Sequence, residues 1–180
     1  MLTILIPERE LYNESTNEFV KTKEYKLQLE HSLVSISKWE SKWNKAFLNK
    51  ETKTEEETMD YIKCMTITQN VPDDAYFGLT NDNIKEIKRY IDAPMTATTF
   101  YNNGNRGMSR ETVTSELIYY WMISLNIPME CQRWHINRLL TLIRVCNIKN
   151  TPPKKMSRKE IMNRNAALNA ARRKQLNTKG

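Results

Sequence analysis

The fold class follows from a change of hydrophobic period within residues 25–43, which read YKLQLEHSLVSISKWESKW. Over residues 25–29 apolar and polar side chains alternate, which is typical of a half-buried strand. From Leu33 onward the apolar side chains recur every three or four residues, so a helix would gather them on one face. The stretch therefore predicts a strand that passes into a short amphipathic helix.

A second alternating stretch lies at the start of the chain, where Leu2, Ile4 and Ile6 would share one face of a strand. Phe19 begins the odd-numbered apolar pattern that continues through Tyr25. We therefore expect an N-terminal antiparallel hairpin or small sheet. The predicted fold class is α+β: this sheet, then a mainly helical body and a basic C-terminal helix.

Two further helices are marked by their first residues. Thr54 is followed three positions later by Glu57, the spacing at which a hydroxyl and a carboxylate satisfy backbone N–H groups at a helix start. Thr80 is placed to cap a third helix. That helix should stop before Pro94, because a residue preceding proline avoids the helical region.

The strongest helical pattern follows. Ser109 is predicted to cap a helix that reaches about Asn126, with its main buried face formed by Val113, Leu117, Tyr120, Trp121 and Ser124 or Leu125. Pro128 suits the first turn of a second long helix over about 129–146. We expect these two helices to form an antiparallel pair at the centre of the core.

Two prolines within residues 150–155 mark a boundary. The predicted domains are a globular body over 1–148, a linker over 149–156 and a basic helical tail over 157–180, whose helix begins with a capping box at Ser157 and Glu160. Residues 149–180 carry ten Lys or Arg against one Glu, whereas the rest of the chain carries 18 basic and 20 acidic residues. The net charge of +7 therefore belongs to the tail.

Composition places the protein among folded, non-exported proteins. A chain of 180 residues with 39% hydrophobic residues and four tryptophans can bury one core. No apolar run is long enough to span a membrane, and the N-terminus lacks the basic start of a secretory signal. The three cysteines are an odd number at wide spacing, which suits free thiols. We expect a cytosolic protein.

The sequence contains none of the common phosphate-binding, metalloprotease or nucleophile motifs. Cys131 and His135 are spaced to share a helical face and hold a metal ion, but two ligands are too few, and a buried cysteine is the favoured interpretation. The acidic run 55–57 with Asp60 is explained more simply by a helix start than by a cation. We predict a non-enzymatic protein with no catalytic residues, no cofactor and no metal.

The basic tail can attract a polyanion such as nucleic acid, without sequence specificity, or bind an acidic protein surface. Composition leaves these alternatives open. The residues predicted to make the contact are the basic ones of the linker and tail helix: Lys154, Lys155, Arg158, Lys159, Arg164, Arg172, Arg173 and Lys174.

Several phrases resemble tail assembly chaperones of long-tailed bacteriophages. They are LQLEHSL at 27–33, SISKWESKW at 35–43, DYIKCM at 60–65, YYWM at 119–122 and WHINRLL at 134–140. The resemblance implies a cytoplasmic factor that binds the tape measure protein during tail morphogenesis. It also implies that a longer form can arise by ribosomal frameshifting near the basic end.

An apolar groove that accepts a helix of the partner is compatible with that function. Its predicted members are Trp39, Trp43, Met59 and Met65, although the two tryptophans with Phe47 fit a core role better.

The competing hypotheses are a structural virion protein, such as a connector or capsid component with a DNA-contacting arm, and a nucleic-acid-binding regulator. The first would place the protein in the virion rather than the host cytoplasm. Self-association into a homo-oligomer also stays open.

Overall fold

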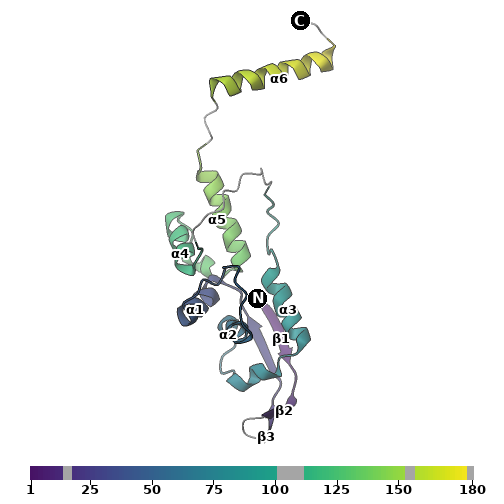
Figure 1. The fold of residues 1–180 in the computed structure, drawn as a ribbon, viewed down its shortest axis with the longest axis vertical. Helices are drawn as coiled ribbons and strands as arrows, with labels where there is room; N and C mark the ends of the chain where they lie inside the picture. Colours follow the sequence, from purple (N-terminus) through teal and green to yellow (C-terminus); the bar gives the residue numbers. More distant parts are fainter. Residues whose placement is uncertain (14–17, 101–111, 153–156, 178–180) are drawn as a thin grey trace. The chain divides into compact units, whose positions relative to one another are not determined.

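The computed structural model describes residues 1–13, 18–100, 112–152 and 157–177. Its elements are, in chain order, β1 (Leu2–Ile6), β2 (Arg9–Asn13), β3 (Glu18–Thr22), β4 (Tyr25–Leu29), α1 (Leu33–Trp43), α2 (Glu55–Met65), the 3-10 helix η1 (Asp73–Gly78), α3 (Asn81–Asp92), α4 (Ser115–Ser124), the 3-10 helix η2 (Met129–Arg133), α5 (Ile136–Asn150) and α6 (Arg158–Leu176). Antiparallel strands followed by helices confirm the α+β fold class (Figure 1). The chain divides into two compact units, Met1–Asn147 and Ile148–Gly180.

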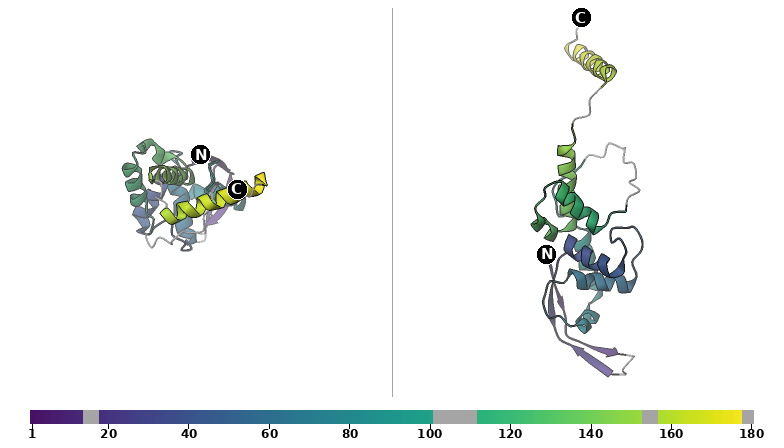
Figure 2. Two further views of the ribbon diagram at one scale, coloured as in Figure 1. Left: turned by 90° about the horizontal axis from the view of Figure 1, so that it is seen from above. Right: turned by 90° about the vertical axis from the view of Figure 1, so that its left-hand side faces the viewer.

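The strands form two antiparallel two-stranded sheets, in which β1 pairs with β4 and β2 pairs with β3 (Figure 2). Ile4 lies opposite Leu27, and both side chains are buried, which confirms the predicted alternation. Phe19 on β3 departs from it, because this residue is 70% exposed. The β1–β4 pair therefore supplies the apolar face on which the helices pack.

Helices α1, α2 and α3 begin close to where the sequence predicts, and α3 also ends where it predicts. Ser32 caps α1, and the capping boxes at Thr54 and Thr80 are both present. Helix α3 ends at Asp92, directly before the Ala93-Pro94 pair. Helix α1 packs against α2, and α3 packs against β1. These contacts enclose the core around the fully buried Ile36 and Met65.

The segment that leaves α2 is joined to the edge of β4. The backbone N–H of Glu30 donates to the carbonyl of Met65 at 2.8 Å, and that of Ile67 donates to the carbonyl of Gln28 at 2.9 Å. These bonds satisfy strand groups that β1 does not reach. They fix the C-terminal end of α2 against the sheet.

The prediction for the fourth helix is wrong in its start and its buried face. Helix α4 begins at Ser115 with Thr114 as its cap, and Ser109 lies outside the described residues. Its buried residues are Ser115, Ile118 and Met122, whereas Tyr120 is 64% exposed. Helix α4 is apolar nearly all round, so local pattern does not indicate which stripe faces the core.

The prediction of one long helix over 129–146 is also wrong, because a break divides this stretch into two helices. Pro128 precedes the 3-10 helix η2, and α5 starts only at Ile136. The break lies where His135 forms a β-bridge with Ser32 and the N–H of Ile136 donates to the carbonyl of His31 at 2.9 Å. These long-range backbone bonds compete with helical ones, and the predicted pair of long helices becomes α4, η2 and α5.

The second unit contains α6, which begins with the predicted capping box at Ser157 and Glu160. The helix spans 19 residues, and none of them is buried. Residues 149 and 150 of the predicted linker belong to the end of α5, whereas 153–156 lie outside the described residues. No helix in the described part of the chain combines the length and apolarity needed to cross a membrane.

Candidate partner-binding groove

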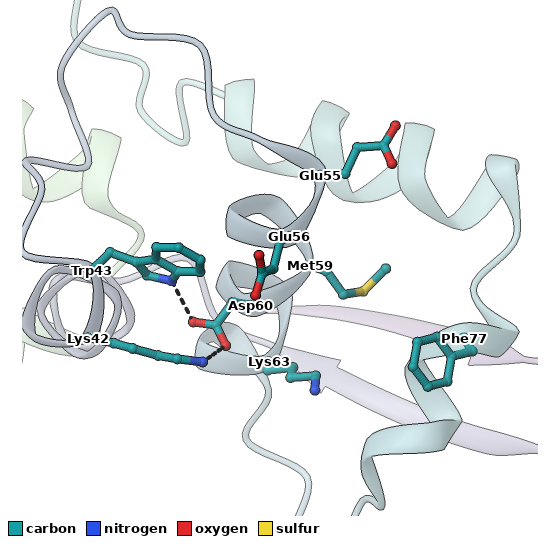
Figure 3. Close-up of a pocket in the computed structure, with 8 residues that line it drawn as sticks. All are labelled: Lys42, Trp43, Glu55, Glu56, Met59, Asp60, Lys63 and Phe77. Carbon is teal, nitrogen blue, oxygen red and sulfur yellow. Dashed lines mark hydrogen bonds and ion pairs between the residues drawn. The ribbon is translucent and has the colours of Figure 1, made fainter. Parts of the chain in front are cut away.

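An open groove lies in the first unit between the end of α1, one face of α2 and the 3-10 helix η1 (Figure 3). Its volume is about 390 Å³, within the range of sites that bind small ligands or the anchoring side chains of a partner. The lining residues are Lys42, Trp43, Glu55, Glu56, Met59, Asp60, Lys63 and Phe77. We call this site the α1–α2–η1 groove.

The Trp43 wall of the groove is held in place by polar and aromatic contacts. The indole N–H of Trp43 donates to Oδ2 of Asp60 at 2.9 Å, and the ammonium of Lys42 donates to Oδ1 of the same carboxylate (Figure 3). Its ring stacks on that of Trp39, with centroids 6.2 Å apart. A half-buried aromatic ring fixed in this way presents a preformed surface, so binding orders fewer side chains.

The opposite side of the groove is apolar and open to solvent. Met59 is half-buried on α2, and Phe77 on η1 is 70% exposed. Figure 3 shows the Met59 side chain on the same side of α2 as Phe77. Trp43, Met59 and Phe77 therefore form a discontinuous apolar surface drawn from three elements.

Charged groups surround that surface. Glu55 and Glu56 are exposed in the first turn of α2, while Lys63 forms an ion pair with Asp73 at 2.6 Å. The hydrogen bond to Asp60 raises the pKa of Lys42, and the hydrogen bond from Lys63 lowers the pKa of Asp73. The N-terminal end of α2 thus gives the groove an acidic edge.

The structure divides the four predicted groove residues into two pairs. Trp43 and Met59 line the groove. Trp39 is 1% exposed and Met65 is fully buried, so a partner cannot reach either of them in this conformation. The indole N–H of Trp39 donates to the carbonyl of Glu57 at 2.8 Å, which joins α1 to α2 inside the core.

Phe77 is a groove residue that the sequence pattern does not predict. It lies in a 3-10 helix, where no amphipathic period marks an exposed apolar residue, and its neighbour Tyr76 is buried. Only the packing of η1 distinguishes the two rings.

Comparison with known proteins adds no relative. No protein-family model, no curated protein and no solved structure matches the chain. The groove combines a fixed aromatic and thioether surface with carboxylates at one end.

The basic residues predicted to contact a partner lie in the second unit. Arg158, Lys159, Arg164, Arg172, Arg173 and Lys174 are all exposed on α6. Lys154 and Lys155 lie outside the described residues. Within its own unit, α6 places cations in its first turn and again in its last turns.

The two histidines meet inside the first unit, which sequence spacing does not show. The rings of His31 and His135 are 4.9 Å apart and edge to face, and both residues are buried. Nδ1 of His31 lies 2.5 Å from the hydroxyl of Tyr61. Nε2 of His135 donates to the carbonyl of Tyr90 at 2.9 Å, while its Nδ1 accepts the N–H of Asn137 at 3.3 Å.

This histidine pair is built to stay uncharged. Burial, helped by the neighbouring His135, lowers the pKa of His31 to about 3. Burial also lowers the pKa of His135, against the opposing effect of its bond to the Tyr90 carbonyl. Since Nδ1 of His135 accepts a hydrogen bond and Nε2 donates one, the neutral imidazole satisfies both contacts. The pair is a closed, polar part of the core.

The interpretation of Cys131 and His135 as neighbours on one helical face is wrong. Cys131 lies in η2 and His135 lies in the break before α5, so the two belong to different elements. Cys131 is buried, in agreement with the favoured interpretation. Across the ranges that the structure describes, no three His, Cys, Asp or Glu side chains come together where they could hold a metal ion.

Proposed function

We propose that this protein is a phage tail assembly chaperone that binds the tape measure protein in the host cytoplasm, with the α1–α2–η1 groove as its contact surface. The observation that carries the proposal is the exposed Phe77 ring beside Trp43 and Met59 in a preformed groove. An aromatic anchor surrounded by polar groups is the usual composition of a protein-binding hot spot.

The groove suits an amphipathic helix better than an extended strand. Its walls are helical, and its backbone amides are engaged within α1 and α2, so it offers no open sheet edge. A partner helix would place one or two apolar side chains between Trp43 and Phe77. A basic residue on the same helix would then face Glu55 and Glu56.

The test compares two variants that remove similar exposed apolar surface. Phe77→Ser changes the groove, whereas Ile123→Ser changes the outer face of α4, where Ile123 is 67% exposed. Both side chains are solvent-exposed, so neither change should cost much stability. Burial of the Phe77 ring in the complex should contribute about 1.5–3 kcal/mol of binding free energy. Phe77→Ser alone should therefore weaken the complex roughly tenfold to hundredfold.

The assay is affinity purification of the full chain from phage-infected cells, with identification of the bound protein and titration of the purified complex. We expect the tape measure protein with wild type and Ile123→Ser, and little of it with Phe77→Ser. Equal recovery with all three proteins would remove the groove from the proposal. Stable incorporation of the protein into washed virions would contradict the chaperone function itself.

A further inference from the structure

The charge of α6 is not explained by the stability of the helix. Over Arg158–Leu176 the helix carries six Lys or Arg against Glu160 alone. Arg172, Arg173 and Lys174 lie near its C-terminus, where cations interact favourably with the helix dipole. Arg158 and Lys159 lie in the first turn, where the dipole disfavours them. The first-turn cations therefore suggest an external anion.

Five of the six cations form two groups, at residues 158–159 and 172–174, and Arg164 lies between them. Residues 165–171 contain no charged side chain. Lys159 and Arg172 are 13 positions apart, which corresponds to about 20 Å along a helix at 1.5 Å per residue. A ligand that engages both groups must present negative charge at two places about that far apart.

The direction of the side chains restricts the ligand further. At 100° per residue, the six cations of α6 project to all sides of the helix instead of forming one stripe. An acidic protein surface would neutralise only the side that faces it. A groove bounded by two phosphate strands supplies negative charge on both sides of an inserted helix.

We propose that α6 binds double-stranded DNA by lying across the major groove, with Arg158 and Lys159 on one phosphate strand and Arg172, Arg173 and Lys174 on the other. The major groove is about 12 Å wide and admits an α-helix, so end groups about 20 Å apart overlie its two edges. The middle of α6 is narrow enough for this, because four of its seven residues are alanine. The site is separate from the α1–α2–η1 groove and does not depend on the proposed function.

Helix α6 is poorly equipped to distinguish one DNA sequence from another. Its described residues include no aromatic side chain that could stack on a base. Asn165 and Asn169 are the polar groups of the middle, and they can donate to either phosphate or base edges. Binding should therefore be driven by phosphate contacts, with little preference among DNA sequences.

The experiment measures fluorescence anisotropy of a labelled 20-base-pair duplex of mixed sequence with the full-length protein between 50 and 200 mM salt. Engagement of about five phosphates predicts a slope of log K against log salt near −4.5. Affinity should then fall several hundredfold over that fourfold change in salt. The triple variant Arg172→Gln, Arg173→Gln, Lys174→Gln should make the slope shallower by about 2.7, and the double variant Arg158→Gln, Lys159→Gln by about 1.8.

The matched control removes three charges from α3 of the first unit, by Lys85→Gln, Lys88→Gln and Arg89→Gln, all of which are exposed. Its slope should equal that of wild type. An equal loss in the control would mean general charge attraction and would overturn the proposal. So would equal or tighter binding to poly-L-glutamate or to single-stranded DNA of the same length, or no duplex binding at 50 mM salt. Phe77→Ser should leave DNA binding unchanged, which separates this site from the groove.

Discussion

Mild acid should destabilise the protein through its buried histidine pair. The folded-state pKa of His31 is about 3, whereas an unfolded histidine titrates near 6.5. Below pH 6.5 the unfolded chain therefore takes up a proton that the folded chain does not, so stability is lost as pH falls. Each pH unit below 6.5 costs about 1.36 kcal/mol, which amounts to about 2 kcal/mol for His31 at pH 5.

The window between pH 6.5 and 5 isolates the histidines. The carboxylates with lowered pKa, such as Glu57 and Asp73, stay largely ionised at pH 5 in both the folded and the unfolded chain. His135 acts in the same direction as His31, because burial lowers its pKa too. The total loss at pH 5 should therefore exceed the contribution of His31 alone.

The assay is urea unfolding followed by tryptophan fluorescence at pH 7.5, 6.0 and 5.0. His31→Asn keeps a polar group near the Tyr61 hydroxyl but cannot titrate, so its free energy of unfolding should lose about 2 kcal/mol less between pH 7.5 and 5.0 than that of wild type. NMR of the wild-type His31 ring gives a direct control that needs no variant. Equal stability at pH 7.5 and 5.0, or a His31 signal that titrates near pH 6.5 in the folded protein, would refute the reasoning.

Three further changes test the packing. Glu40→Ala removes the carboxylate that accepts the N–H of Phe47 at 2.8 Å and that of Ser115 at 2.7 Å. Chemical denaturation should show a loss of about 1–3 kcal/mol for each buried amide, and Glu40→Gln should lose less because one acceptor oxygen remains. Trp39→Phe leaves a cavity and removes the indole N–H that donates to the Glu57 carbonyl; its thermal unfolding should correspond to a loss of about 1–3 kcal/mol, whereas an unchanged midpoint would mean that Trp39 is not a core anchor. Ser157→Ala removes the cap of α6 and should speed amide exchange in its first turn, consistent with about 1 kcal/mol; exchange as slow as in wild type would contradict the capping box.

Sequence was sufficient where structure is set by neighbours along the chain. The alternation of Leu27 and Leu29 and the helix caps at Thr54, Thr80 and Ser157 depend on spacings of two or three residues. The sequence was insufficient where residues far apart in the chain compete for the same backbone hydrogen bonds. The break before α5 depends on the bridge between Ser32 and His135, which lie far apart in the chain.

The candidate groove was predicted only in part for the same reason. Trp39 and Trp43 are spaced to lie on one face of α1, yet the packing of α2 buries the first and leaves the second half-exposed. Helical spacing indicates which residues share a face, but not how far the neighbouring element covers that face. Phe77 has no helical period at all and becomes visible only through the position of η1.

The carboxylate of Glu40 makes the first unit more cooperative than its short helices suggest. It links α1 to the Phe47 segment and to the first turn of α4, across 75 residues of sequence. If α4 detached, the buried carboxylate of Glu40 on α1 would lose the Ser115 N–H that it accepts, and α1 also carries Trp43. Helices α4 and α1 should therefore open together. In hydrogen exchange, the slowest amides of the two helices should report the same opening free energy.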